Sequence, residues 1–75
     1  MEPYRNVEGN SDVTAYQVGP DYITLQFSDG STYRYTYISA GQENVERMKS
    51  LAQAGQGLDT FINAAIRKLY ERKEK

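Results

Sequence analysis

Apolar and polar residues alternate along the first half of the chain in the pattern of β-strands. The alternation predicts strands over residues 13–18, 22–27 and 31–38. Two segments with the composition of turns separate them, Gly19-Pro20-Asp21 and Ser28-Asp29-Gly30. Each strand has one face made of alternate residues: Thr14, Tyr16 and Val18 in the first, Ile23, Leu25 and Phe27 in the second, and Tyr33, Tyr35 and Tyr37 in the third.

The loop between the second and third strands decides which residues share a face of the sheet. A two-residue Asp29-Gly30 turn would pair Phe27 with Thr32 and split the apolar residues between the two faces. A three-residue loop with Gly30 in the left-handed conformation pairs Leu25 with Tyr33 and gathers the apolar residues on one face. We prefer the second register, which leaves to water Thr24, Gln26, Thr32 and Arg34.

The second half of the chain has the three- and four-residue spacing of helices. The first helix is expected from about residue 40 to 54, with Ser39 and Gln42 as a capping box and Gly55 as the C-cap. Asp59 is expected to cap a second helix over about residues 60–72. Its apolar stripe consists of Phe61, Ile62, Ala65, Ile66, Leu69 and Tyr70.

The predicted fold is therefore α+β: a three-stranded antiparallel meander followed by two C-terminal helices packed on one face, in the order β-β-β-α-α. The chain has 75 residues, enough for one domain. We expect a flexible arm over residues 1–10, the domain over 11–72 and a basic tail over 73–75.

Composition removes most catalytic chemistry. The sequence contains no cysteine and no histidine, which excludes thiol nucleophiles, zinc–thiolate sites and the usual general base. The acidic residues fall mostly in turns, caps and helix surfaces. We therefore expect no enzyme, cofactor or metal. A polar N-terminus without an apolar run and the absence of a long apolar segment predict a cytoplasmic protein without a membrane contact.

Charge is distributed unevenly although the net charge is only −1. Five cations stand in the last nine residues against Glu71 and Glu74, which gives +3 there and −4 in the rest. They are Arg67, Lys68, Arg72, Lys73 and Lys75. Such a segment is typical of an interaction tail. Alternatively, the cations offset the dipole at the C-terminus of the second helix.

Tyrosine is the other unusual feature, with seven in the chain and three in the segment 33–37. Rings on a sheet can stack nucleic-acid bases. The preferred register instead assigns Tyr33 and Tyr35 to the core under the helices, which leaves Tyr37 as the candidate for exposure.

The order and spacing of several short motifs over residues 11–70 resemble the KTSC domain family. The matching residues are Tyr16, Leu25-x-Phe27-x-x-Gly30, Tyr33-x-Tyr35, Met48-x-x-Leu51, Gly55-x-Gly57-Leu58, Phe61-Ile62-Asn63 and Ile66-Arg67-x-x-Tyr70. The chain departs from the family at Ile38-Ser39-Ala40, where many members carry Val-Pro. The family occurs at the C-terminus of some lysyl-tRNA synthetases and alone in small bacterial proteins, so the resemblance implies a role in RNA binding.

The expected function is a non-catalytic binding module that contacts RNA through Tyr37, Arg67, Lys68, Arg72 and Lys73. A basic strip that joins Arg34 or Arg47 to the C-terminal segment would favour this function. The alternative is a protein-interaction module, including a homodimer formed at the edge of the strand 13–18.

Overall fold

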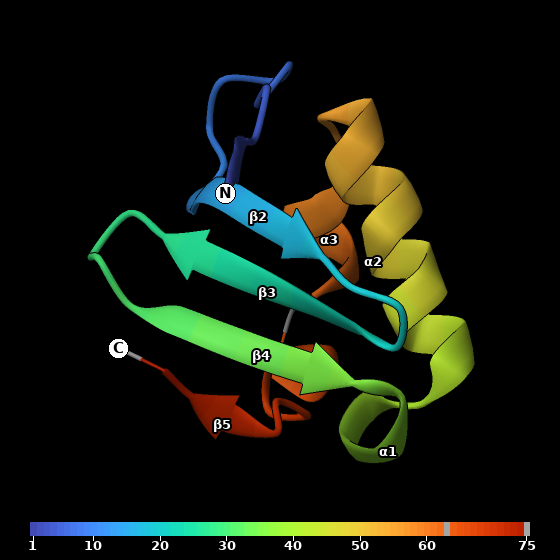
Figure 1. Cartoon of the computed structure of the whole chain (residues 1–75). Helices are drawn as coiled ribbons and strands as arrows, with labels where there is room; N and C mark the ends of the chain where they lie inside the picture. The colour runs from blue at the N-terminus through green and yellow to red at the C-terminus, as the bar shows by residue number, and fades with distance from the viewer. Residues whose placement is uncertain (63, 75) are drawn as a thin grey trace.

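The computed structural model describes residues 1–62 and 64–74 and contains a five-stranded antiparallel sheet with helices on one side of it (Figure 1). The strands follow one another across the sheet in chain order: β1 (Glu2–Pro3), β2 (Val13–Val18), β3 (Tyr22–Phe27), β4 (Thr32–Thr36) and β5 (Arg72–Lys73). The helices are α1 (Tyr37–Ala40), α2 (Gln42–Ala54), α3 (Leu58–Phe61) and α4 (Ala64–Arg67). The α+β class and the antiparallel sheet are confirmed.

The hairpin of β3 and β4 has the register expected from a three-residue loop. Leu25 pairs with Tyr33 and Ile23 with Tyr35, and the Phe27 N–H donates to the Ser31 carbonyl at 2.8 Å. Gly30 has φ +89°, a conformation that favours glycine. The apolar side chains of both strands consequently lie on the face that the helices cover.

A bulge in β2 changes which residues of that strand reach the core. Val13 pairs with Phe27 and Ala15 with Gln26, so one extra residue, Thr14, stands between these pairs. Val13 therefore shares the core face with Tyr16, and it is 1% exposed. Strict alternation wrongly placed Val13 on the opposite face, because period-two counting does not allow for an inserted residue.

The first predicted helix is present, but it starts differently. The capping box is formed by Thr36 and Ser39 and begins the one-turn helix α1, whereas the N-cap of α2 is Gly41. The predicted capping box of Ser39 with Gln42 is therefore wrong, because Ser39 belongs to the box that begins α1. Gly55 ends α2 in the left-handed conformation at φ +78°, as expected.

The second predicted helix is not continuous. Only α3 and α4 are helical, and the chain then returns as β5 beside β4. The Glu71 and Glu74 N–H groups donate to the carbonyls of Arg34 and Thr32, which would otherwise lie at a free edge. The five residues after Tyr70 are all charged and offer no apolar face to hold a helix, so pairing with β4 prevails. The prediction of three strands and two C-terminal helices is thus corrected.

The segment 1–10, expected to be a loose arm, packs against the body of the protein. β1 pairs with β2, Tyr4 is 7% exposed, and the Arg5 guanidinium donates to the Gln53 and Ala54 carbonyls at 2.8 and 2.9 Å. Asp59 accepts hydrogen bonds from the Ser11 hydroxyl and the Asp12 N–H. It therefore ties the start of the domain to α3, and the N-cap role predicted for it belongs to Gly57.

The core lies between the sheet and α2 and α3. Its fully buried side chains include Val13, Ile23, Leu25, Tyr35, Val45, Met48 and Leu58. Among the described helices, none is long and apolar enough to cross a membrane. Asn63, one of the residues that carry the resemblance, and Lys75 of the predicted basic tail lie outside the described residues.

Candidate functional site

The face of the sheet opposite the helices is lined by polar and charged side chains. Because side chains alternate along a strand, the residues paired between the core positions point to this open face. From β2 to the β5 edge they are Ala15, Gln17, Tyr22, Thr24, Gln26, Thr32, Arg34 and Arg72. Figure 1 views this open face of the sheet, with α3 behind β2 and β3.

Arg34 lies near the middle of this face and is held in place by an aromatic ring. Its guanidinium carbon lies 4.2 Å from the centroid of the Tyr22 ring, a cation–π contact. The Tyr22 ring itself packs on Gly19, where an added Cβ would come within 2.0 Å of it. Gly19 thus leaves room for the Tyr22 ring, and the ring fixes the position of the Arg34 guanidinium.

Arg72 of β5 stands directly opposite Arg34 in the ladder with β4. Two like charges in this position repel each other and destabilise a strand pair. One carboxylate oxygen, Oε2 of Glu74, lies 3.3 Å from Nη2 of Arg34 and 3.2 Å from Nη2 of Arg72. The Glu74 N–H donates to the Thr32 carbonyl at 2.7 Å, so the backbone of Glu74 is anchored beside the two arginines.

Two polar atoms at the centre of this face have no hydrogen-bond partner among residues 1–62 and 64–74. They are Oγ1 of Thr24 and Nε of Arg34, and both are buried. Thr24 and Arg34 are directly paired across β3 and β4. Thr24 and Thr32 are 1% and 7% exposed, so the expectation that water would cover them is wrong: larger neighbours enclose these short side chains.

The other predicted contact residues of the C-terminal segment lie around the β5 edge. Lys73 pairs with Tyr33 and has its Nζ 5.8 Å from that ring, on the helix side of the sheet. The Arg67 guanidinium lies 4.4 Å from the Phe27 ring centroid, and Lys68 is exposed. The structure therefore brings Arg34 together with Arg72, and it arranges Arg67 and Lys73 on the opposite side of the same edge.

Tyr37 is not part of this group. It begins α1, and its hydroxyl donates to Glu46 of α2, which also accepts from Lys49 at 2.8 Å. The bond to Glu46 raises the pKa of the Tyr37 phenol, and the bond from Lys49 lowers the pKa of the Glu46 carboxyl. An acidic neighbour on the hydroxyl makes Tyr37 a poor contact for a phosphate.

Tyr33, Tyr35 and Tyr70 form an aromatic cluster under the sheet rather than a stacking platform. Tyr35 is fully buried and its hydroxyl donates to the Arg67 carbonyl at 3.0 Å, which confirms its assignment to the core. The Tyr33 and Tyr70 rings meet edge to face at 4.7 Å, and Tyr33 is half-buried. The other family-motif positions are structural: Gly57 caps α3, and Phe61 and Ile66 pack on the core.

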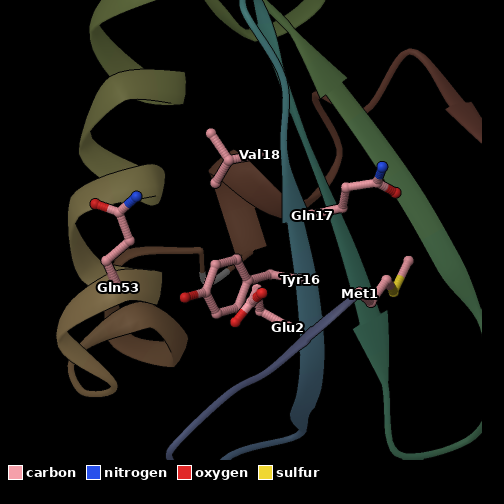
Figure 2. Close-up of a pocket in the computed structure, with 6 residues that line it drawn as sticks. All are labelled: Met1, Glu2, Tyr16, Gln17, Val18 and Gln53. Atoms are coloured by element: carbon pink, nitrogen blue, oxygen red, sulfur yellow. The ribbon is translucent and has the colours of Figure 1, made fainter.

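A second feature is a shallow groove of about 530 Å³ between the β2 edge and α2, shown in Figure 2. Tyr16 and Val18 point to the α2 side of β2, toward Gln53, and Gln17 points away (Figure 2). β1 pairs only with Tyr16 and Ala15, so it ends before Val18. Alternate residues bond to opposite neighbours, so the N–H and C=O of Val18 face the unpaired part of this edge.

Acidic side chains do not gather into a metal site in the described part of the chain: no group of three or more potential ligands comes together there. A further hollow on α2 is lined by Glu43, Asn44, Glu46, Arg47, Ser50 and Phe61, of mixed charge.

Sequence reasoning placed Arg34 on the open side of the sheet but missed its neighbour. Arg72 was assigned to a helix, and a two-residue strand between charged residues carries no alternation that could have identified it. Tyr22, an aromatic residue of the open face, lies on the side that its alternation with Ile23 indicates. No signal in the sequence indicated that it packs against Arg34.

Comparison of this chain with protein-family models, with curated proteins and with solved structures found no match.

Proposed function

We propose that this chain is a non-catalytic binding module for single-stranded nucleic acid, RNA in the first place, and that the open face beside β4 and β5 contacts the phosphates. The observation that carries the proposal is the direct pairing of Arg34 with Arg72 on a face without a helix in the described part of the chain. Phosphate contacts by arginine supply most of the affinity of such modules.

The cost of the arginine pair for the sheet supports a role beyond folding. Two guanidinium groups opposite each other oppose strand pairing, and a single glutamate offsets them. The alternative explanation for the cations, a helix dipole, applies only to Arg67, because α4 ends there. Arg72 and Lys73 lie in the strand β5, so a helix dipole does not explain their positive charges.

Aromatic support and the shape of the surface favour a single strand. Arg34 is stacked on Tyr22, and a flat guanidinium presented in this way can in turn stack on an exposed base. The net charge of −1 predicts modest affinity that depends on low salt. The resemblance to the KTSC family points in the same direction and favours RNA. The absence of cysteine from the sequence is consistent with a cytoplasmic site of action.

Titration of the isotope-labelled protein with short single-stranded RNA at low salt tests the proposal. We expect chemical-shift changes at the amides of Arg34, Arg72 and Lys73. With about three phosphates neutralised, the logarithm of the association constant should fall with the logarithm of salt with a slope of about −2. Unchanged spectra, or changes confined to the β2 edge and α2, would refute it.

A protein-interaction function is the second candidate, and the open end of β2 favours it. The unpaired backbone of Val18 and the adjoining groove could accept an added strand from a second copy of this chain. Sedimentation equilibrium at micromolar concentration separates the candidates: a monomer at all concentrations would exclude self-association, whereas a dimer that Val18→Lys dissociates would support it.

A further inference from the structure

The arrangement of the charged groups Arg34, Arg72 and Glu74 on the open face indicates where a phosphate would bind, and not only that phosphate is attracted to this face. We infer that Arg34 and Arg72 form one oxyanion site for a backbone phosphodiester, and that the carboxylate of Glu74 occupies this site in the free protein as an internal competitor. The inference rests on the proposed function, since it names the atoms that receive the phosphate.

The hydrogen-bonding capacity of Arg34 is only partly used. Nε and Nη2 are the two nitrogens of one edge of a guanidinium, and this edge can bind two oxygens of the same anion side by side. Glu74 contacts Nη2 at 3.3 Å, whereas Nε has no partner among the described residues. A phosphate with two oxygens on this edge would satisfy both nitrogens.

Glu74 also uses a single oxygen for two arginines. Its Oε2 lies 3.3 Å from Arg34 and 3.2 Å from Arg72, near the upper limit for charged hydrogen bonds. A phosphodiester has two non-bridging oxygens: one can bind Nε of Arg34, and the other can replace Oε2 of Glu74 between the Nη2 atoms of Arg34 and Arg72.

The position of Glu74 suits a competitor rather than a permanent structural ion pair. Its backbone is fixed by the bond to the Thr32 carbonyl, and Glu74 directly follows the two-residue strand β5. The side chains of Arg34 and Glu74 are 27% and 25% exposed, so an incoming phosphate can reach this ion pair and displace the carboxylate. Binding would then release Glu74 and exchange one anion for another between the same two guanidinium groups.

Glu74→Gln removes the competing charge and keeps the size of the side chain. We expect it to bind single-stranded RNA about two- to fivefold more tightly than the natural chain, the range that an exposed ion pair can supply. Glu71→Gln is the matched control, because it changes the net charge equally in the same segment and lies outside the site. It should raise affinity less than Glu74→Gln.

Equal affinities of the two variants would reduce the effect to net charge and overturn the inference, as would a Glu74→Gln variant that binds no better than the natural chain. If none of the three proteins binds RNA, the proposed function fails, and inorganic phosphate decides the site separately. A phosphate-dependent shift of the Arg34 Nε–H signal in Glu74→Gln, weaker in Glu71→Gln, would keep the oxyanion site for another ligand. No shift in Glu74→Gln would remove it.

Discussion

Tyr35 shows at the scale of one residue how burial sets chemistry in this protein. The side chain is fully buried, and its hydroxyl donates to the carbonyl of Arg67. Burial disfavours the phenolate and raises the pKa of Tyr35 to about 12, against an ordinary value of 10.0. The phenol therefore remains neutral at pH values at which a tyrosine in water would ionise.

The expected consequence is a loss of stability in alkali. The folded pKa lies above the unfolded one, so the contribution of Tyr35 is complete below pH 10 and is lost as the pH rises toward 12. Ultraviolet titration at 25 °C should show a late tyrosine step in this range or together with unfolding. In Tyr35→Phe this late step should be smaller by one tyrosine, because the pKa values of Tyr4 and Tyr37 are also raised, and a late step of unchanged size would contradict the assignment.

The pKa of Asp29 is shifted in the opposite direction to that of Tyr35. Its carboxylate accepts from the hydroxyl and the N–H of Ser31 at 2.6 and 2.9 Å, and these bonds hold the pKa of Asp29 below its usual 3.8. Its contribution is present above about pH 4 and is lost as the pH falls through the lower folded pKa. Asp29→Asn should therefore lower the free energy of unfolding at pH 7 more than at pH 3, as measured by urea unfolding. An equal loss at both pH values would contradict this.

At the scale of the elements, several contacts hold the N-terminal segment to the body of the protein. Arg5 makes one of them, because its guanidinium caps the last carbonyls of α2 beside Gly55. We expect Arg5→Met to lower the free energy of unfolding by about 1 kcal/mol, since two charged hydrogen bonds are lost at an exposed site. Arg47→Met, which removes a cation from the exposed side of the same helix, is the control. Equal losses in both variants would argue against the tether.

Strand β5 is the element that departs most from the sequence prediction, and it can be checked directly. Nuclear Overhauser contacts between Arg34 and Arg72 and Cα chemical shifts of extended type at Arg72 and Lys73 are expected. Helical shifts running without a break from residue 60 to 72 would restore the predicted helix and separate the two arginines.

The central sheet could be predicted because its information is local. The alternation around Ile23, Leu25 and Phe27 and the loop glycine at 30 were sufficient to define the register. The bulge at Thr14 could not be predicted, because period-two counting does not allow for an inserted residue. The strand at Arg72 could not be predicted, because it depends on pairing with a distant segment. The candidate site shares this limit: its two arginines are 38 positions apart and meet only through β5.

Over the whole molecule, the two faces of the sheet have different roles: one forms the core and the other carries the candidate site. Helices cover one face, and Val45, Met48 and Leu58 close the core against it. The other face carries Tyr22, Arg34 and Arg72, which form a row across the neighbouring strands β3, β4 and β5. Figure 1 labels these three strands. A weakly acidic chain can therefore still present a local positive surface. The affinity of this surface for nucleic acid should decrease as the salt concentration increases.

The central claim is that this row binds the phosphates of a single strand. The most direct test compares Arg34→Gln and Arg72→Gln with Arg47→Gln, a charge-matched variant on α2, in anisotropy titrations with single-stranded RNA at low salt. We predict that each variant in the row weakens binding about three- to tenfold and reduces the salt slope by about 0.7, with little change in Arg47→Gln. Equal weakening by all three, or no binding by the natural chain, would contradict the account.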